Sequence, residues 1–176
     1  GVLINNKEAS AKKSSLKRPK SLPCDVYHIS VKGQPYFVFV GLYENRPYEI
    51  FAGKNGVIDK KIKSGEIIKY RQKQYKVIFD DESELCPVTA FTTDEEDIVT
   101  RLISANLRNN IDMQLVVDQL RKAKGDMTTF AKSIAKALAK YIPDGTELEE
   151  TCPECELRLI HEGGCIICRG CGHSRC

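Results

Sequence analysis

The chain has 176 residues, of which 41% are hydrophobic and 29% are charged, and its formal net charge is +3. This length supports one modest hydrophobic core and a small additional module, and so low a net charge does not by itself indicate a nucleic-acid-binding protein. The sequence has no apolar run of membrane-spanning length and no signal-peptide pattern, so we expect a soluble, cytoplasmic protein without a membrane partner. Because the sequence begins with Gly1 rather than Met, we expect it to be part of a longer chain.

The first 21 residues are rich in Lys and Arg and poor in apolar side chains. Such a segment buries too little surface to offset the entropy lost on ordering, so we predict a basic flexible linker over residues 1–21. The alternative is a contact with phosphate groups or with an acidic partner surface. We favour the linker. Five of its basic residues lie close together, namely Lys12, Lys13, Lys17, Arg18 and Lys20.

Residues 25–79 alternate between apolar and polar positions with the period of a β-strand. Gly, Pro and Asn separate the apolar runs, as expected of turns between antiparallel strands. We therefore predict an antiparallel sheet of about five strands. The predicted strands are 26–31, 36–42, 48–52, 67–70 and 74–79.

Residues 94–142 change to the spacing of an amphipathic helix. A capping box begins at Thr93, Asp112 can cap a second helix, and Asp126 or Thr128 can begin a third. Three helices joined by connections of a few residues should pack as a compact bundle against the sheet.

The predicted fold class is therefore α+β. A small antiparallel sheet at 25–79 is followed by a three-helix bundle at 94–142, and both belong to one domain at 22–146. A zinc-ribbon-like, cysteine-rich tail follows at 147–176.

The tail holds six of the eight cysteines of the chain. In a reducing compartment, clustered cysteines indicate a metal site or catalysis rather than a disulfide framework. Two C-x-x-C pairs can close a tetrahedral zinc site, because the short turn lets both sulfurs of a pair reach one ion. Zinc takes four thiolates, and two thiols near a chain end can then cycle between dithiol and disulfide. This combination indicates a carrier of reducing equivalents.

The favoured zinc ligands are Cys152, Cys155, Cys165 and Cys168. This choice leaves Cys171 and Cys176 as the redox pair, separated by a loop long enough to close a disulfide. His173 and Arg175 lie in that loop and would favour a nearby thiolate when they are protonated.

An alternative ligand set uses Cys168 and Cys171 as the second C-x-x-C pair. Gly172 supports it, since glycine suits the positive φ that commonly follows such a turn. Cys165 and Cys176 would then be the remaining thiols. We favour the first set, because the alternative places Cys165 inside the ribbon with little freedom to move.

Single polar residues elsewhere are weaker candidates. His28 lies on a predicted strand, where a structural role is favoured, and His161 would compete with six thiols for zinc. Cys24 and Cys86 are isolated in the sequence, and free cysteines are commonly small buried apolar residues. The sequence offers no glycine-rich phosphate loop and no nucleophile paired with a base.

Three separated groups of residues carry a family resemblance. They are Leu22–His28 with Pro47–Phe51, the helical stretches 101–108 and 130–142, and the ending Glu162–Cys176. Taken together, and over almost the whole chain from Lys17, they resemble the C-terminal region of adenosylcobalamin-dependent (class II) ribonucleotide reductases.

The resemblance implies that the tail dithiol re-reduces a disulfide formed in the reductase active site at each turnover. Cys171 and Cys176 match the position expected of this pair, and thioredoxin or a similar dithiol donor would then reduce it. By resemblance, adenosylcobalamin and the ribonucleoside diphosphate or triphosphate substrate bind a catalytic domain, which would be the partner of this chain. The chain alone lacks the catalytic barrel and should not reduce ribonucleotides.

The alternative function is a zinc-ribbon module that binds nucleic acid through its lysine-rich N-terminus. Binding through phosphate contacts weakens steeply with ionic strength, so salt dependence would separate the two hypotheses. We favour the reductase function, in which nucleic acid is not a partner.

Overall fold

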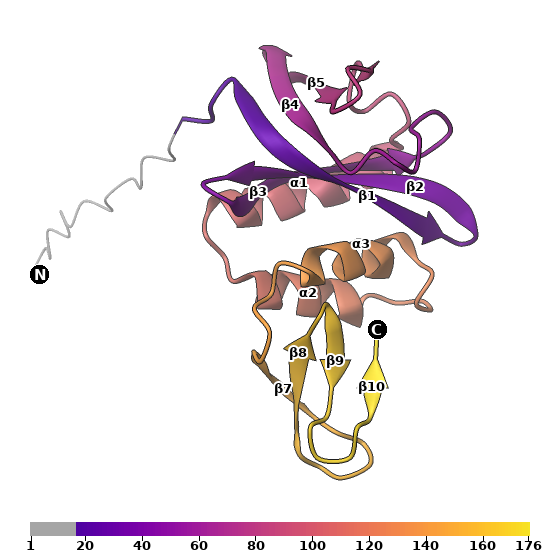
Figure 1. The fold of residues 1–176 in the computed structure, drawn as a ribbon, viewed down its shortest axis with the longest axis vertical. Coiled ribbons are helices and arrows are strands. Elements are labelled where there is room, and N and C mark those ends of the chain that lie inside the picture. Colours follow the sequence, from indigo (N-terminus) through magenta and orange to yellow (C-terminus); the bar gives the residue numbers. More distant parts are fainter. Residues whose placement is uncertain (1–16) are drawn as a thin grey trace, which may run out of the picture.

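The computed structural model describes residues 17–176, which form a sheet, a layer of helices and a small second sheet (Figure 1). The strands of the first sheet are β1 (Ser21–Val31), β2 (Gln34–Tyr43), β3 (Arg46–Lys54), β4 (Ser64–Arg71), β5 (Gln74–Phe79) and β6 (Glu84–Leu85). The helices are α1 (Asp94–Arg108), α2 (Met113–Lys122) and α3 (Phe130–Ala139). The last strands are β7 (Glu147–Thr151), β8 (Arg158–Glu162), β9 (Cys165–Ile167) and β10 (Ser174–Arg175).

The first sheet is antiparallel and has the strand order β3-β2-β1-β4-β5-β6. The five predicted strands are present, and the two-residue strand β6 adds a sixth. Strand β1 pairs with β2 along most of its length but with β4 only from Ser21 to Asp25. Beyond Asp25, strands β1 and β4 therefore diverge.

The two faces of the sheet belong to two different hydrophobic cores. In β2, Val38 and Val40 pack with the helices, whereas Phe37 and Phe39 pack with residues of β4 and β5. Successive side chains of a strand point to opposite faces, so the continuous apolar run of β2 supplies both cores. The helices cover one face only, as Figure 1 shows.

Side-chain caps fix where two of the helices begin. The Thr93 hydroxyl accepts from the Glu96 N–H at 3.2 Å, and the Glu96 carboxylate accepts from the Thr93 N–H at 3.1 Å, which confirms the predicted capping box. Asp112 caps α2 by accepting from the Gln114 N–H at 3.0 Å. Helix α3 begins at Phe130, shortly after the predicted start.

The second sheet forms a separate module at the C-terminal end of the chain. Its strand order is β10-β9-β8-β7, and its core contains Leu148, Leu159 and Ile166 together with cysteine side chains. The predicted α+β fold class, with a sheet, three helices and a zinc-ribbon-like tail, is confirmed.

Part of the predicted linker is an anchored segment. The Arg18 side chain is 8% exposed, and its Nη2 donates to Glu49 Oε1 at 2.5 Å. Glu49 is fully buried in β3 and also pairs with Arg108 of α1 at 3.2 Å. The prediction of a linker is therefore wrong from Arg18 to Ser21, because burying the Glu49 carboxylate requires a cationic partner. Lys12 and Lys13 lie outside the described residues.

Replacement of Arg18 by alanine should destabilise the sheet strongly. Removing one partner of a buried ion pair leaves the charge of the other partner, here Glu49, only partly compensated. We therefore expect Arg18→Ala to lower the free energy of unfolding by about 3 kcal/mol. Arg101→Ala is the matched control, since the Arg101–Asp97 pair lies on the exposed surface of α1. That change should cost less than about 0.5 kcal/mol. Urea denaturation of the two variants checks this, and equal effects would contradict it.

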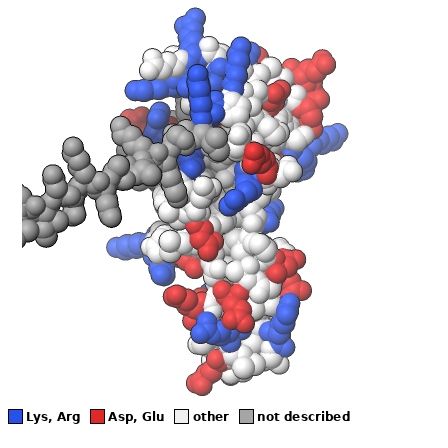
Figure 2. All heavy atoms as spheres, turned by 90° about the vertical axis from the view of Figure 1, so that its left-hand side faces the viewer, with Lys and Arg blue, Asp and Glu red and all other residues white. Residues whose placement is uncertain are grey.

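No helix within residues 17–176 has the length and apolarity needed to cross a membrane. On the face shown in Figure 2, basic side chains gather at the sheet end of the molecule, and acidic and basic side chains are mixed over the tail module.

Candidate functional site

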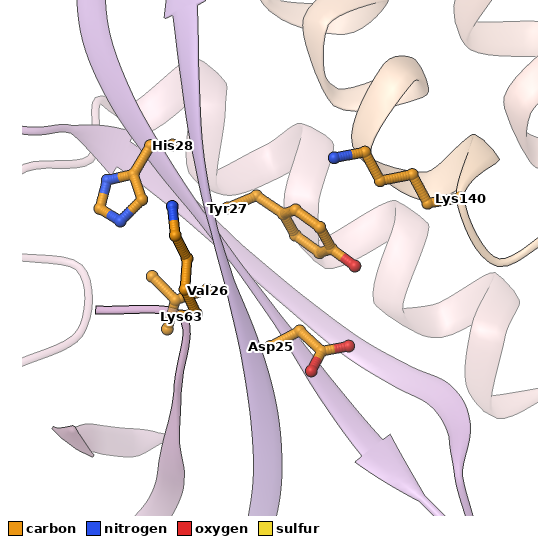
Figure 3. A pocket seen from close by; sticks show the side chains of 6 residues that line it. All are labelled: Asp25, Val26, Tyr27, His28, Lys63 and Lys140. Carbon is orange, nitrogen blue, oxygen red and sulfur yellow. The ribbon is translucent and has the colours of Figure 1, made fainter. Parts of the chain in front are cut away.

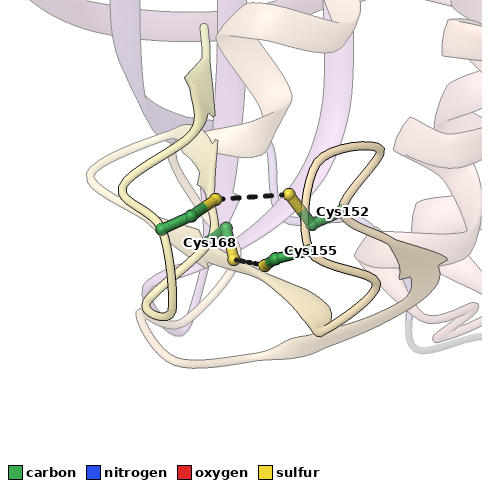
Figure 4. A group of neighbouring side chains, drawn as sticks. Cys152, Cys155 and Cys168 are labelled. Carbon is green, nitrogen blue, oxygen red and sulfur yellow. Dashed lines mark hydrogen bonds between the residues drawn. The ribbon is translucent and has the colours of Figure 1, made fainter.

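Four cysteines of the tail module converge to a metal-binding geometry (Figure 4). The Sγ atoms of Cys152, Cys155, Cys168 and Cys171 all lie within 4.8 Å of one another. The shortest separations are 3.3 Å between Cys155 and Cys168 and 3.5 Å between Cys152 and Cys171. Four sulfurs about 2.3 Å from one tetrahedral ion would be roughly 3.8 Å apart. We call these four residues the cysteine quartet.

The quartet is built from two turns with the same hydrogen-bond pattern. In the first, the Glu156 N–H donates to the Cys152 carbonyl at 2.9 Å, and in the second the Gly172 N–H donates to the Cys168 carbonyl at 2.9 Å. Both donor residues have positive φ, 62° at Glu156 and 79° at Gly172. Each turn thus brings the two cysteines of its C-x-x-C pair to one side. This repetition favours a thiolate-coordinated metal, and four Cys ligands suit zinc.

The turn around Cys168 also favours the thiolate form that a metal requires. Hydrogen bonding from the Cys171 backbone amide, together with the Cys155 thiol, lowers the pKa of Cys168 to about 6, while hydrogen bonding among the clustered thiols raises the pKa of Cys155 and Cys171. A thiolate is the form of cysteine that coordinates metal ions.

The other two tail cysteines form a disulfide. Cys165 and Cys176 are bonded, and their Cα atoms are 4.3 Å apart. In the pairing of β9 with β10, Arg175 lies opposite Ile166, so the next pair along the ladder places Cys176 opposite Cys165. The disulfide therefore closes the end of the β9–β10 ladder, next to the carboxyl terminus.

The structure corrects the favoured ligand set at one position. Cys165 lies outside the cysteine quartet and Cys171 lies inside it, as in the alternative that Gly172 supported. The structure does not bring the two residues of the favoured redox pair together, because Cys171 belongs to the quartet and Cys176 is bonded to Cys165.

Strand geometry explains this outcome. Ile166 is 3% exposed and packs into the module core, so the flanking Cys165 points to the other face of β9. Cys165 also follows Gly163 and Gly164, which have φ values of 58° and 82° and form the β8–β9 turn. Cys165 is therefore beside a glycine turn and begins β9, which lies inside the sheet between β8 and β10.

The charged residues near the disulfide are already paired. Arg175 forms an ion pair with Glu150, and His173 Nδ1 lies 3.6 Å from Glu154 Oε1. The sequence predicts that both residues favour a nearby thiolate. It does not indicate these two glutamate partners, which come from the first part of the module in the chain.

Outside the tail, the isolated candidate site residues lie in surroundings that are typical of structural residues. Cys24 is 2% exposed, and burial together with nearby carboxylates raises its pKa to about 12, which makes it a poor nucleophile. Cys86 is exposed and belongs to no cluster of ligands among the described residues. His28 binds the Ile62 carbonyl through Nε2 at 2.8 Å.

His161 lies outside the cysteine quartet and is 1% exposed. Neither of its ring nitrogens has a hydrogen-bond partner among residues 17–176. Burial, and then the charge of Arg121, lower the pKa of His161, so the neutral ring is favoured.

Comparison with known proteins places most of this chain in one family. A family model described as the NrdJ homologue C-terminal domain matches residues 22–143, which cover the sheet and the three helices. No curated protein and no solved structure matches the chain. The cysteine quartet and the disulfide follow the matched region. The chain therefore belongs to the NrdJ homologue C-terminal domain family, and this membership relates it to class II ribonucleotide reductase.

Proposed function

We propose that this chain is the C-terminal part of an adenosylcobalamin-dependent ribonucleotide reductase and that Cys165 and Cys176 re-reduce the active-site disulfide. The observation that carries the proposal is the division of the six tail cysteines. Four of them form a metal-type cluster and two form a disulfide outside it, in a member of this reductase-related family.

The proposed reaction is a pair of thiol–disulfide exchanges. In the reduced tail, one thiolate attacks the active-site disulfide and forms a mixed disulfide, and the second tail thiolate then displaces it. Two electrons and two protons pass to the active site, which regains its dithiol, and the Cys165–Cys176 disulfide forms. Thioredoxin or a similar dithiol donor would reduce this disulfide for the next cycle.

The arrangement suits this reaction because a bound metal would separate the two groups of cysteines. A zinc ion held by the quartet would keep all four thiolates coordinated, including the exposed Cys171, and would maintain the module without taking part in exchange. Cys176 is exposed, and the half-buried Cys165 follows the glycine turn. Exchange requires such access.

The remaining parts of the function are proposals of the same kind. The catalytic barrel, the adenosylcobalamin site and the ribonucleotide site would belong to the catalytic part of the enzyme. The reducing conditions needed for this cycle fit a cytoplasmic location.

Thiol mapping tests the redox assignment on this chain. The zinc-loaded, reduced protein is oxidised mildly, alkylated and digested, and we expect the Cys165–Cys176 disulfide with the quartet protected by its metal. Thioredoxin with its reductase and NADPH should then reopen this bond and consume about one NADPH per chain. Cys165→Ser should abolish the NADPH consumption, and Cys86→Ser, the matched control, should leave it unchanged.

Two outcomes would contradict the proposal. One is a disulfide within the quartet while zinc is retained. The other is a Cys165–Cys176 disulfide that thioredoxin and small dithiols both fail to reduce.

A further inference from the structure

A cavity of about 440 Å³ lies where β1 and β4 diverge (Figure 3). No residue of the cysteine quartet lines this cavity. Its lining comes from β1, from the residue before β4 and from the residue after α3. The lining residues are Asp25, Val26, Tyr27, His28, Lys63 and Lys140. A cavity of this size matches the sites that hold small ligands in other proteins.

The backbone of β1 is open toward this cavity. The Val26 N–H donates to the Lys63 carbonyl at 2.8 Å, on the side away from β2. Because the peptide groups of an antiparallel strand alternate in direction, the N–H of His28 points to the same side. Among residues 17–176, no strand pairs with β1 on this side beyond Asp25, where the ladder with β4 ends. A backbone donor is therefore available in the cavity wall.

Two ammonium groups enter the cavity from different elements. Lys63 comes from the segment before β4 and Lys140 follows the last residue of α3, and the Lys140 Nζ lies 4.7 Å from the centre of the Tyr27 ring. Within residues 17–176, neither lysine forms an ion pair. The cavity therefore holds two ammonium groups that are not in direct contact with a carboxylate of the described residues.

The wall of the cavity is fixed by His28. Its Nε2 donates to the Ile62 carbonyl at 2.8 Å, since a carbonyl can only accept, and its Nδ1 faces the Asn55 amide nitrogen at 3.4 Å. His28 thus ties the segment before Lys63 to β1. Both ring nitrogens are used, so the imidazole positions this wall and does not bind ligand.

An acceptor lies at the other end of the cavity. Asp25 Oδ2 accepts from the Tyr141 hydroxyl at 2.5 Å, and the Tyr141 oxygen accepts from the Tyr27 hydroxyl at 2.8 Å. Burial raises the pKa of both tyrosines, so both hydroxyls remain protonated donors. The Asp25 carboxylate is therefore held in place as a hydrogen-bond acceptor.

We propose that this cavity binds a small phosphate ester that also carries a hydroxyl group. Lys63, Lys140 and the His28 N–H would hold the phosphate, because lysine ammonium groups and backbone amides are common phosphate donors. A hydroxyl of the same ligand would donate to Asp25. This proposal rests on residues of β1, on Lys63 before β4 and on Lys140 after α3, and it is independent of the redox assignment.

Titration followed by backbone amide NMR shifts tests the site in the full chain. Inorganic pyrophosphate should shift the His28 amide, and Lys63→Ala or Lys140→Ala should each weaken its binding about tenfold or more, the usual loss for one charge-assisted contact. Lys61→Ala is the matched control, because it removes the same charge from the same segment but Lys61 does not line the cavity. It should change the affinity less than about twofold.

A second variant tests the acceptor end of the cavity. Asp25→Asn should strengthen the binding of pyrophosphate, since it removes a negative charge, and should weaken the binding of adenosine 5′-phosphate relative to pyrophosphate. If Asp25→Asn changes the affinity for both probes equally, the ligand hydroxyl does not bind Asp25.

Three results would overturn the proposal. They are the absence of pyrophosphate binding at millimolar concentration, equal weakening by Lys61→Ala and Lys63→Ala, and tighter binding of a hexaglutamate peptide than of either phosphate. The last result would assign the cavity to an acidic protein partner.

Discussion

Removal of zinc is expected to unfold the module formed by β7 to β10 and to leave the sheet and helices folded. The core of this module is small, and two of its five buried members are the quartet residues Cys152 and Cys168. So few apolar side chains cannot hold four short strands together, and the metal would supply most of the stability. In small zinc modules the apparent binding free energy is about 10 to 16 kcal/mol. Chelation should therefore eliminate the structure of residues 147–176.

The matched pair of Cys168→Ser and Cys165→Ser separates the quartet from the disulfide. The two residues are three positions apart, but one lies in the quartet and the other in the disulfide. We expect Cys168→Ser to lose zinc and the amide protection of β8, and Cys165→Ser to retain about one zinc per chain. Metal analysis and hydrogen exchange measure the two effects. Retention of zinc by Cys168→Ser would contradict the ligand set.

The rest of the fold should survive because its two cores do not depend on the tail. One core joins the helices to one face of the sheet, and the other lies on the opposite face. The hydrogen bond from Gln114 of α2 to the Glu147 carbonyl at 3.0 Å is one of the links between the helices and the tail module. Loss of the helix and sheet amide signals on chelation would show instead that the two parts fold together.

Local patterns in the sequence predict most of this fold. The apolar run of β2 and the capping box at Thr93 are set by neighbours a few residues away, and the structure confirms both. The thiol spacing predicted a tail able to bind a metal, because the C-x-x-C turn is also local. What these patterns share is that each depends on the conformation of one short segment.

Contacts between distant segments could not be predicted in the same way. Arg18 has the composition of a linker residue, and only the position of Glu49 in β3, brought close by the fold, makes it a buried partner. The choice between Cys165 and Cys171 likewise depends on which face of β9 Cys165 occupies and on the turn after β9 that holds Cys171. Strand register decides the first, and a shift of one residue would move Cys165 to the other face.

The position of Cys165 matches the expectation that it lies inside the ribbon. It begins β9, which lies between β8 and β10, directly after Gly163 and Gly164. Its partner Cys176 lies opposite it across the β9–β10 pair. Access to the pair therefore requires only that the short β10 strand separates from β9, while the quartet remains intact.

In the complete reductase, Cys165→Ser or Cys176→Ser is expected to stop turnover with thioredoxin after about one cycle per active site, because the buried disulfide is no longer reached by a tail dithiol. Zinc should be retained, since neither residue belongs to the quartet. A small dithiol such as dithiothreitol should restore turnover, because it can diffuse into the active site. Single-turnover product formation, followed by steady-state rates with each reductant, measures both effects.

The control for this experiment is Cys171→Ser, which distinguishes loss of the shuttle from loss of the module. Cys171 is a quartet residue, so its replacement should release zinc and reduce turnover with thioredoxin through disorder of the whole tail. Cys165→Ser should instead stall with zinc bound. If Cys165→Ser and Cys176→Ser both turn over normally with thioredoxin, the tail disulfide is not the shuttle. If Cys171→Ser stalls with its zinc retained, the exchange runs through Cys171, and the roles of the quartet and the disulfide must be reassigned.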